Sequence, residues 1–215
     1  MNRLVALGFF DGVHLGHGAL LRECRNLADS LCAEAAAVTF SVHPQALIRG
    51  KAPALINSAA DREFLMRSLY GMDSVITLPF DRALMATHWS QFLQWLTDLN
   101  AAGFVCGSDF RFGAGGNGTA KKLQAFCSSR SLACCIVPQQ KLRGIRVSST
   151  YIRQLLEERE MAQAVQFLGH PHILTGTVIS GRQLGRTLGI PTANIPLPEG
   201  VICPKHGVYA CKVFA

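Results

Sequence analysis

The chain has 215 residues, of which 49% are apolar and 16% are charged. This composition supplies a sizeable core and is too apolar for a disordered protein, while no apolar run approaches the roughly 20 residues of a membrane span. The net charge of +7 favours anionic partners, and because the positive residues are scattered along the chain, phosphorylated small molecules are favoured over nucleic acid.

The eight cysteines include no Cys-x-x-Cys pair, which argues against a zinc site. Most of them have apolar neighbours, as the sequence around Cys24, Cys32, Cys127 and Cys211 shows. We therefore predict small buried side chains in a reducing cytoplasm, without disulfides.

Five short apolar runs predict buried β-strands, at residues 4–8, 36–40, 75–78, 103–106 and 134–137. Helical patterns separate these runs. Such alternation predicts an α/β fold, in which right-handed crossovers build a doubly wound, mostly parallel sheet. Ligands of this kind of sheet bind at the carboxyl ends of the strands, near the point where the strand order reverses.

Apolar residues at helical spacing predict the helices between the strands. The expected buried stripes are Leu20, Leu21, Cys24, Leu27, Ala28 and Leu31; Leu65, Met66 and Leu69; Trp89, Phe92, Leu93 and Leu96; and Leu123, Phe126 and Cys127. Ser58, three residues before Asp61, has the pattern of a capping box that starts the second of these helices.

The pattern changes near residues 169–171, and the rest of the chain is rich in Gly, Pro and strand-forming residues. This change predicts a first domain at residues 1–170 and a second, β-rich domain at 171–215. Because the sequence stops inside a strand-like run, we expect the second domain to be incomplete.

Residues 8–17, Gly-Phe-Phe-Asp-Gly-Val-His-Leu-Gly-His, join the first strand to the first helix. A helix N-terminus offers free N–H groups to a phosphate, and Gly16 allows a phosphate to approach the backbone. His14 and His17 can both donate to phosphate oxygens. The alternative is a glycine-rich turn with two surface histidines, but the strand–turn–helix context favours phosphate binding.

Residues 147–153, Val-Ser-Ser-Thr-Tyr-Ile-Arg, start the last helix of the first domain. Ser148 or Ser149 is expected to cap it. Together with Thr150 and Arg153, these hydroxyls form a second anion cradle. Alone, this segment is more typical of an ordinary cap with a solvent-facing arginine, but two such helix starts on one sheet favour a function.

These segments resemble, in their order along the chain, the bacterial bifunctional riboflavin kinase/FAD synthetases. The resemblance extends to Thr-Phe-Ser-Val-His-Pro at 39–44, Leu-Pro-Phe-Asp at 78–81 and Val-Cys-Gly-Ser-Asp-Phe-Arg-Phe-Gly at 105–113. It also covers Gly-Arg-Thr-Leu-Gly-Ile-Pro-Thr-Ala-Asn at 185–194, which is similar to the start of the kinase domain. Several spaced motifs in the correct order are more specific than any single one.

The resemblance implies a nucleotidyltransferase of Rossmann-like type at residues 1–170, followed by the N-terminal part of a riboflavin kinase β-barrel. In this family the FMN phosphate attacks the α-phosphorus of Mg-ATP, and FAD and pyrophosphate are formed. His14 and His17 would stabilise charge on the α-phosphate, and the residues that would hold the β- and γ-phosphates are Gly16, Ser148, Ser149, Thr150 and Arg153. The implied ligands are ATP, FMN, riboflavin and phosphate-bound Mg²⁺ without a protein cage, in a cytoplasmic protein with no nucleic-acid or membrane partner.

On the flavin side, the resemblance implies Phe40, His43, Pro44, Asp109, Phe110 and Phe112. For the three phenylalanines, core packing is an equal alternative. Thr192 and Asn194 are the candidates for a Mg-ATP site of the kinase. The acidic base of that kinase would lie beyond the last residue, so we expect no riboflavin kinase activity from this chain.

Two positions depart from the family pattern: Val42 replaces a proline, and Phe9 stands where asparagine is frequent. Three other interpretations remain. The chain is a nucleotidyltransferase with another phosphate acceptor, such as phosphopantetheine or nicotinamide mononucleotide; it is an inactive nucleotide-binding fragment; or it is a basic RNA-binding module, for which no RNA motif is visible.

Overall fold

The computed structural model describes residues 2–181, 187 and 189–214, and it has five parallel strands in the order β3-β2-β1-β4-β5. The strands are β1 (Arg3–Leu7), β2 (Glu34–Phe40), β3 (Ser74–Leu78), β4 (Ala101–Gly107) and β5 (Ala133–Val137). Each overlaps one of the five predicted runs. The doubly wound α/β fold is therefore confirmed, and the strand order reverses between β1 and β4.

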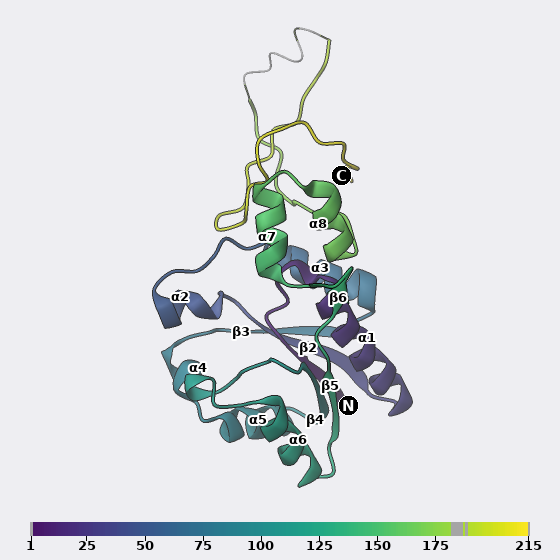
Figure 1. Cartoon of the computed structure of the whole chain (residues 1–215), viewed down its shortest axis with the longest axis vertical. Helices are drawn as coiled ribbons and strands as arrows, with labels where there is room; N and C mark the ends of the chain where they lie inside the picture. The colour runs from purple at the N-terminus through teal and green to yellow at the C-terminus, as the bar shows by residue number, and fades with distance from the viewer. Residues whose placement is uncertain (1, 182–186, 188, 215) are drawn as a thin grey trace.

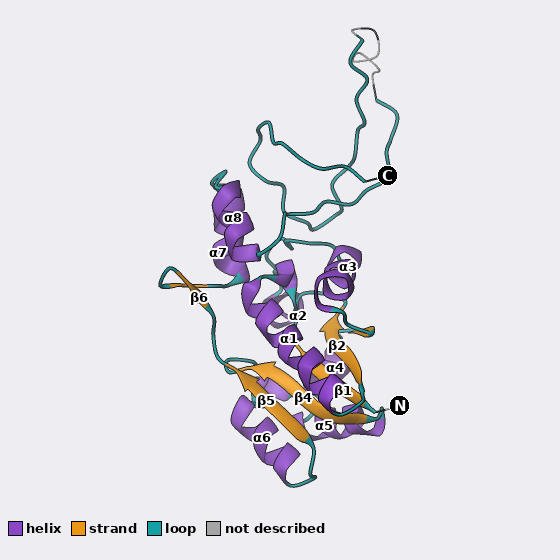
Figure 2. Cartoon of the chain, turned by 90° about the vertical axis from the view of Figure 1, so that its right-hand side faces the viewer, coloured by secondary structure: helices purple, strands orange, loops and turns teal. Residues whose placement is uncertain are grey.

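Helices cover both faces of the sheet (Figures 1 and 2). One face packs against α1 (Leu15–Ser30) and α3 (Ala59–Tyr70). The other packs against α5 (Trp89–Asp98) and α6 (Ala120–Ser128), with α4 (Arg82–Ala86) beside them. The short α2 (Pro44–Arg49) follows β2.

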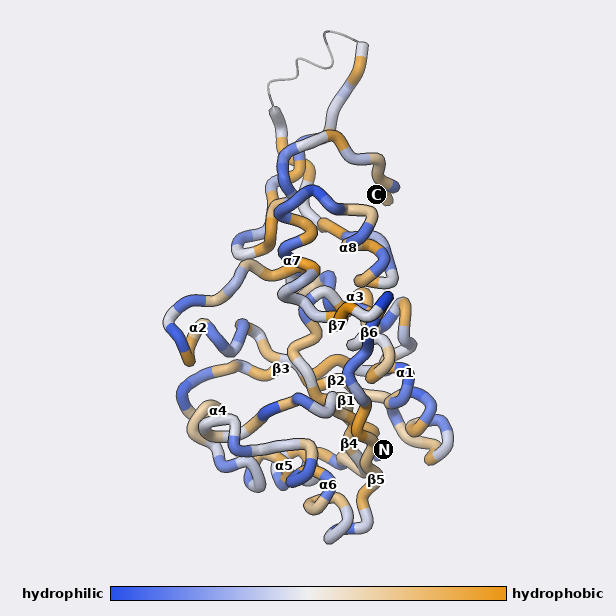
Figure 3. The backbone as a smooth tube through the Cα atoms, viewed as in Figure 1, coloured by the Kyte–Doolittle hydropathy of each residue, from blue (hydrophilic) through white to orange (hydrophobic). Residues whose placement is uncertain are grey.

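Alternating strand residues belong to two separate cores, one on each face of the sheet, because successive side chains of a β-strand point to opposite faces. In β1, Leu4 and Ala6 pack on the side of α1, whereas Val5 and Leu7 pack on the side of α5 and α6. Both sides of the central strands are apolar, so these strands appear as orange stretches within the molecule in Figure 3.

The predicted helix stripes are buried except near helix ends. Leu31 follows the last residue of α1 and is 51% exposed, and Leu69, in the last turn of α3, is 47% exposed. Ser58 caps α3 as predicted, because its hydroxyl accepts a hydrogen bond from the Asp61 N–H and donates one to the Asp61 carboxylate.

The cysteine prediction is only partly right. All eight are free thiols, and Cys24 and Cys127 are buried as predicted. Cys32 and Cys211 are exposed, which corrects the prediction for these two. Cys32 lies in the turn after α1, between the exposed Leu31 and the buried Ala33, so an apolar neighbour in the sequence does not by itself bury it.

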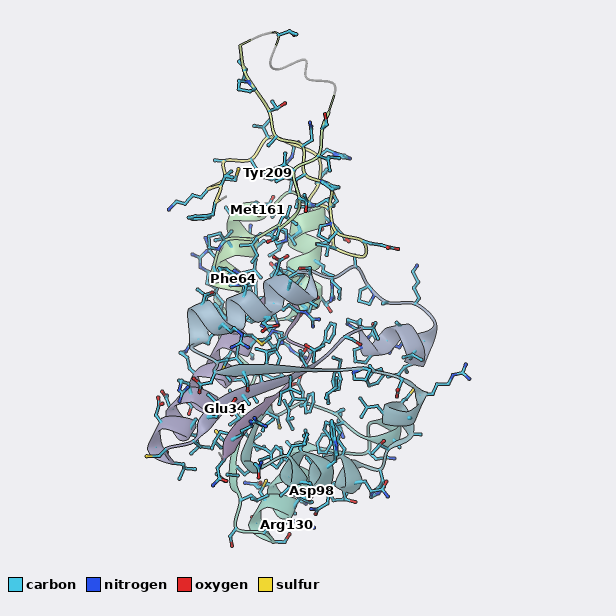
Figure 4. The ribbon with its side chains drawn as sticks, turned by 180° about the vertical axis from the view of Figure 1, so that it is seen from behind. Glu34, Phe64, Asp98, Arg130, Met161 and Tyr209 are labelled. Carbon is cyan, nitrogen blue, oxygen red and sulfur yellow. The ribbon has the colours of Figure 1, made fainter. Side chains whose placement is uncertain are left out.

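A third core lies beyond the carboxyl ends of the strands. It joins α7 (Ser149–Glu157) and α8 (Met161–Leu168), which lie above the sheet in Figure 1. A two-stranded hairpin of β6 (Lys141–Leu142) and β7 (Ile145–Arg146) precedes α7. Met161 and the C-terminal Tyr209 lie at this end of the molecule in Figure 4, and Asp98 and Arg130 lie at the opposite end.

The described part of residues 171–214 forms isolated bridges rather than ladders. Ile179 pairs antiparallel with Asn194, and Leu55 pairs parallel with Val201. Ile202 is buried in the third core. The C-terminal segment therefore packs back onto the first 170 residues.

Candidate active site

A cleft of about 690 Å³ opens where the strand order reverses, at the carboxyl ends of β1 and β4. Phe9 enters it after β1, and Gly107 and Asp109 enter it after β4. The cleft is lined by all seven residues that the sequence assigned to phosphates: His14, Gly16, His17, Ser148, Ser149, Thr150 and Arg153. Two segments more than 130 positions apart thus meet at the edge predicted for a ligand.

The two histidines are stacked face to face at the start of α1. Their ring centroids are 3.6 Å apart and their planes differ by 10°. His14 caps the helix, because its Nδ1 accepts a hydrogen bond from the His17 N–H at 3.3 Å. In neutral His14 the proton therefore resides on Nε2, which is free to donate. A Cβ at Gly16 would be tight, since it would lie 3.2 Å from the His14 ring and would require that ring to shift.

Both histidines are neutral at pH 7. Burial lowers the pKa of His14 to about 4, and the nearby His170, Arg153 and Arg146 act in the same direction. Burial also lowers the pKa of His17 well below its ordinary value, with contributions from His14 and Arg62. His17 Nδ1 is buried without a hydrogen-bond partner among the described residues. The pair therefore offers neutral donors, rather than cations, to a ligand.

The turn between β1 and α1 has an unusual backbone. Phe10 and Val13 have φ values of 58° and 41°, in the left-handed region that residues other than glycine rarely adopt, least of all β-branched residues such as Val13. Strain of this kind persists only where surrounding contacts fix it, and it is frequent at functional sites. Here the short helix η1 (Asp11–Val13) is buried and presents His14 to the cleft.

Ser148 is the residue that caps α7, through a hydrogen bond from the Tyr151 N–H. The Ser149 hydroxyl donates to the Asp11 carbonyl oxygen at 2.9 Å, which ties α7 to the turn after β1. Thr150 is exposed at the mouth of the cleft. Of the three hydroxyls, those of Ser148 and Ser149 are therefore also structural.

Arg153 does not face solvent, because it forms an ion pair with Asp11. Its Nη2 lies 2.6 Å from Asp11 Oδ2, and its Nε donates to the Ala54 carbonyl at 2.7 Å. Asp11 Oδ1 also accepts the Ile56 N–H at 2.9 Å. Sequence reasoning gave Asp11 no role, although its place in the first motif, beside the histidines, was a signal.

Only part of the predicted flavin side lines the cleft. His43 and Asp109 do, whereas Phe40 and Phe112 are buried in the core between the sheet and α5. Phe110 stacks on Phe112 against the same core, and Pro44 is the first residue of α2. None of Phe40, Pro44, Phe110 or Phe112 lines the cleft, so core packing accounts for the contacts of the three phenylalanines.

Asp109 is already paired across the cleft mouth. Its Oδ2 accepts hydrogen bonds from Arg146 of β7 at 2.5 Å and from Gln139 at 3.0 Å. Arg146 and Gln139 also line the cleft and were not predicted. The segment that carries them follows β5 and is hydrophilic, which makes it blue in Figure 3.

Two buried polar residues, Arg62 and His170, contact the backbone that carries the cleft residues. Neither of them was predicted from the sequence. Arg62 of α3 donates to the carbonyl oxygens of Phe9 and Phe40. His170 places Nε2 at 3.0 Å from the Gly12 carbonyl oxygen. A signal for Arg62 existed, because position 62 continues the buried stripe of Leu65 and Met66 one helical turn earlier.

The two candidate kinase residues lie far along the chain from the cleft. Thr192 and Asn194 are exposed, and Asn194 is bridged to Ile179. Within their motif, residues 185, 186 and 188 lie outside the described residues. In the described part of the chain, no group of three or more His, Cys, Asp or Glu side chains is placed to hold a metal ion.

A doubly wound parallel sheet with two helix starts converging on one cleft defines an α/β protein whose cleft is of the kind that binds phosphate groups at helix N-termini. Comparison with family models agrees with this class. Residues 1–151 match the FAD synthetase model, and residues 168–215 match the riboflavin kinase model.

Individual relatives give the same result over almost the whole chain. The bifunctional riboflavin kinase/FMN adenylyltransferase of Listeria monocytogenes is 35% identical, over 99% of this chain and 68% of that protein. The proteins of the same name from Bacillus subtilis and Escherichia coli K12 are 34% and 35% identical, over 97% and 98% of this chain and 66% and 67% of theirs. The chain belongs to the family of bifunctional riboflavin kinase/FMN adenylyltransferases and spans about two thirds of the length of these relatives.

A solved structure with the same fold is described as a macrolide-efflux protein from Streptococcus pneumoniae. It is 30% identical, has a TM-score of 0.84, and covers 97% of this chain and 68% of its own. Among the helices of the present chain that the structure describes, none is long and apolar enough to cross a membrane. The likeness to the solved structure is one of fold, and the description as a macrolide-efflux protein applies to that structure.

Proposed function

We propose that this chain transfers the adenylyl group of ATP to FMN, with the chemistry in residues 1–170. A phosphate oxygen of FMN attacks the α-phosphorus, the bond to the bridging oxygen breaks, and pyrophosphate leaves as FAD forms. The observation that carries the proposal is the convergence of all seven phosphate-side residues in one cleft of a chain that matches the FAD synthetase model.

The roles follow from the positions of the donors. His14, through Nε2, and His17, which also lines the cleft, donate to oxygens of the α-phosphate, where charge develops in the transition state. The start of α7, with Ser148, Ser149 and Thr150, binds the β- and γ-phosphates, whose oxygens accept hydrogen bonds from its free N–H groups. Such transfers need positioning and charge stabilisation more than covalent help.

Mg²⁺ arrives in this proposal bound to ATP. Mg²⁺ usually retains several waters and is held by substrate phosphates with only one or two protein ligands. Bound in this way, it neutralises triphosphate charge. Arg153, fixed by Asp11 at the cleft wall, provides the nearby protein cation.

His17→Ala tests the assignment. Loss of a hydrogen-bond donor to a developing charge is expected to reduce the rate at least about a hundredfold. Pyrophosphate release with Mg-ATP and FMN measures it, and the exposed His88→Ala is the control. A His17→Ala variant that retains near-normal turnover would remove His17 from the mechanism.

The same assay separates the alternatives. The wild-type chain is expected to release pyrophosphate with FMN but not with nicotinamide mononucleotide or phosphopantetheine. Turnover with one of these other acceptors would reassign the substrate, and no turnover with any of them would leave a nucleotide-binding fragment.

For residues 171–215, the match to the riboflavin kinase model supports assigning Thr192 and Asn194 to the nucleotide site of that domain.

A further inference from the structure

Arg62 is a buried cation directly beneath the cleft. Its side chain is 1% exposed. Nη1 donates to the Phe9 carbonyl oxygen at 2.6 Å and lies 3.4 Å from Thr39 Oγ1, and Nη2 donates to the Phe40 carbonyl oxygen at 3.2 Å. One guanidinium therefore holds the backbone at the carboxyl ends of both β1 and β2.

Burying the charged Arg62 side chain costs more free energy than packing α3 against the sheet with an apolar side chain would. A guanidinium stays charged at neutral pH, and the ion pairs among the described residues do not include Arg62. Its Nε is buried and has no hydrogen-bond partner in the described part of the chain. Asp11 attracts the guanidinium through space but forms its direct ion pair with Arg153. Burying the Arg62 charge without a direct ion pair is unfavourable, and an apolar residue could hold α3 against the sheet at a lower cost in free energy. The position of Arg62 therefore calls for a role other than packing.

The contacts of Arg62 lead to the cleft wall through Phe9. The guanidinium carbon lies 4.4 Å from the centroid of the Phe9 ring, which is within cation–π distance. The Phe9 ring in turn meets His43 edge to face, with centroids 4.8 Å apart. Both Phe9 and His43 line the cleft, whereas Arg62 does not. The three side chains form a continuous stack from the core to the surface of the cleft.

We propose that Arg62 is a positioning residue for an aromatic wall made by Phe9 and His43, against which the planar ring system of the acceptor substrate lies. Arg62 fixes this wall by holding the main chain of Phe9 from one side and its ring from another. The inference rests on the proposed function, because it takes FMN as the acceptor. None of the phosphate-side residues belongs to the wall, so we expect the wall to affect FMN binding far more than ATP binding.

Arg62→Met tests the proposal, because methionine keeps an unbranched stem and removes the charge and donors. We expect KM for FMN to rise roughly tenfold, equivalent to about 1.4 kcal/mol, while KM for ATP stays within about twofold. Arg62→Lys, which keeps the cation, is expected to recover part of the FMN affinity. The matched control is Arg67→Met on the same helix, because Arg67 pairs with Glu63 and the Asp73 carbonyl oxygen away from the cleft.

Phe9→Leu provides a second test that leaves the donors of Arg62 with their carbonyl partners. It should raise KM for FMN as Arg62→Met does, and the double variant should add little, because the two residues act on one wall. This variant carries the test if Arg62→Met does not fold, which thermal unfolding would show. A merely structural Arg62 would lower stability and change KM for both substrates equally, and that result overturns the proposal.

Direct binding separates this inference from the proposed function. FMN binding is measured by quenching of flavin fluorescence, which needs no turnover. If the wild-type chain binds FMN but releases no pyrophosphate, the proposed reaction fails while the wall can still be tested by the Kd values. If the wild-type chain turns over and Arg62→Met binds FMN with an unchanged Kd, only the inference about Arg62 fails.

Discussion

His14 and His17 combine two demands in two adjacent rings. In the proposed reaction they must be buried enough to exclude water around a phosphate, yet they must keep a proton to donate. Stacking at 3.6 Å satisfies both, because one ring caps the helix through Nδ1 and the other leaves a nitrogen unpaired. Because burial lowers the pKa of His14 to about 4, the folded state holds this side chain neutral at a cost that depends on pH.

The stability of the protein is expected to fall as pH falls from 6.5 towards 4. In this window the unfolded chain binds a proton at His14 that the folded chain does not bind, so acid favours unfolding. The contribution of one such group is at most about 1.4 kcal/mol per pH unit. His14→Asn keeps a good N-cap and removes the titration of this residue. The dependence of stability on pH is expected to become shallower without disappearing, because the pKa of His17 is lowered as well, and urea unfolding at several pH values measures its slope.

The control for this experiment is His88→Asn. His88 also caps a helix, α5, but it is exposed. This variant should retain the wild-type slope. An equal flattening in both variants would show that the burial of His14 does not cause the effect.

At the scale of elements, the buried Asp11–Arg153 pair joins the turn after β1 to the start of α7. The side chains are 2% and 12% exposed, and Asp11 also fixes the loop at Ile56. The two halves of the phosphate site are therefore connected by charge and not only by packing. This pairing corrects the view of Arg153 as a solvent-facing side chain.

Asp11→Asn is expected to destabilise the protein by about 3 kcal/mol, since it leaves a largely buried guanidinium facing a neutral amide. KM for ATP should rise because Arg153 is no longer fixed at the cleft wall. Chemical unfolding and pyrophosphate release measure the two effects.

Asp29→Asn provides the comparison for Asp11→Asn. Asp29 forms a 2.5 Å ion pair with Arg25 on α1 but is 63% exposed. Because exposed pairs contribute little, this change should cost less than about 1 kcal/mol and leave the kinetics unaltered. Equal costs for the two variants would contradict the importance of burial.

At the scale of the whole molecule, the C-terminal segment packs against a loop that also supports the site. Leu55 exchanges backbone hydrogen bonds with residues 200 and 202, at 2.7 Å each. On either side of Leu55, Ala54 accepts from Arg153 and Ile56 donates to Asp11. The loop at residues 54–56 thus contacts both the phosphate side of the cleft and the segment that matches riboflavin kinase.

Ile202→Ala is expected to destabilise the protein by roughly 2–5 kcal/mol, because Ile202 is 5% exposed in the core of α7 and α8. Movement of the adjoining loop should also raise KM for ATP. The matched control is Ile190→Ala, at a position that is 69% exposed, which should stay within about 0.5 kcal/mol of the wild type. Wild-type kinetics and stability for Ile202→Ala would mean that the segment is not coupled to the site.

The α/β fold, the five strands, the two helix starts that line the cleft and, through a resemblance, the family could all be predicted from the sequence. These features are local. The periods of 2 residues in strands and 3.6 in helices, like helix caps, depend on residues that are close together in the sequence. The contacts between distant groups could not be predicted in this way: Asp11 meets Arg153 across 142 positions, and Arg62 meets the Phe9 carbonyl across 53. Such pairs depend on the order of the strands, because the sheet brings loops together at one edge irrespective of their separation along the chain. The same order left Phe40 and Phe112 in the core, since both rings pack between the sheet and α5 rather than toward the cleft.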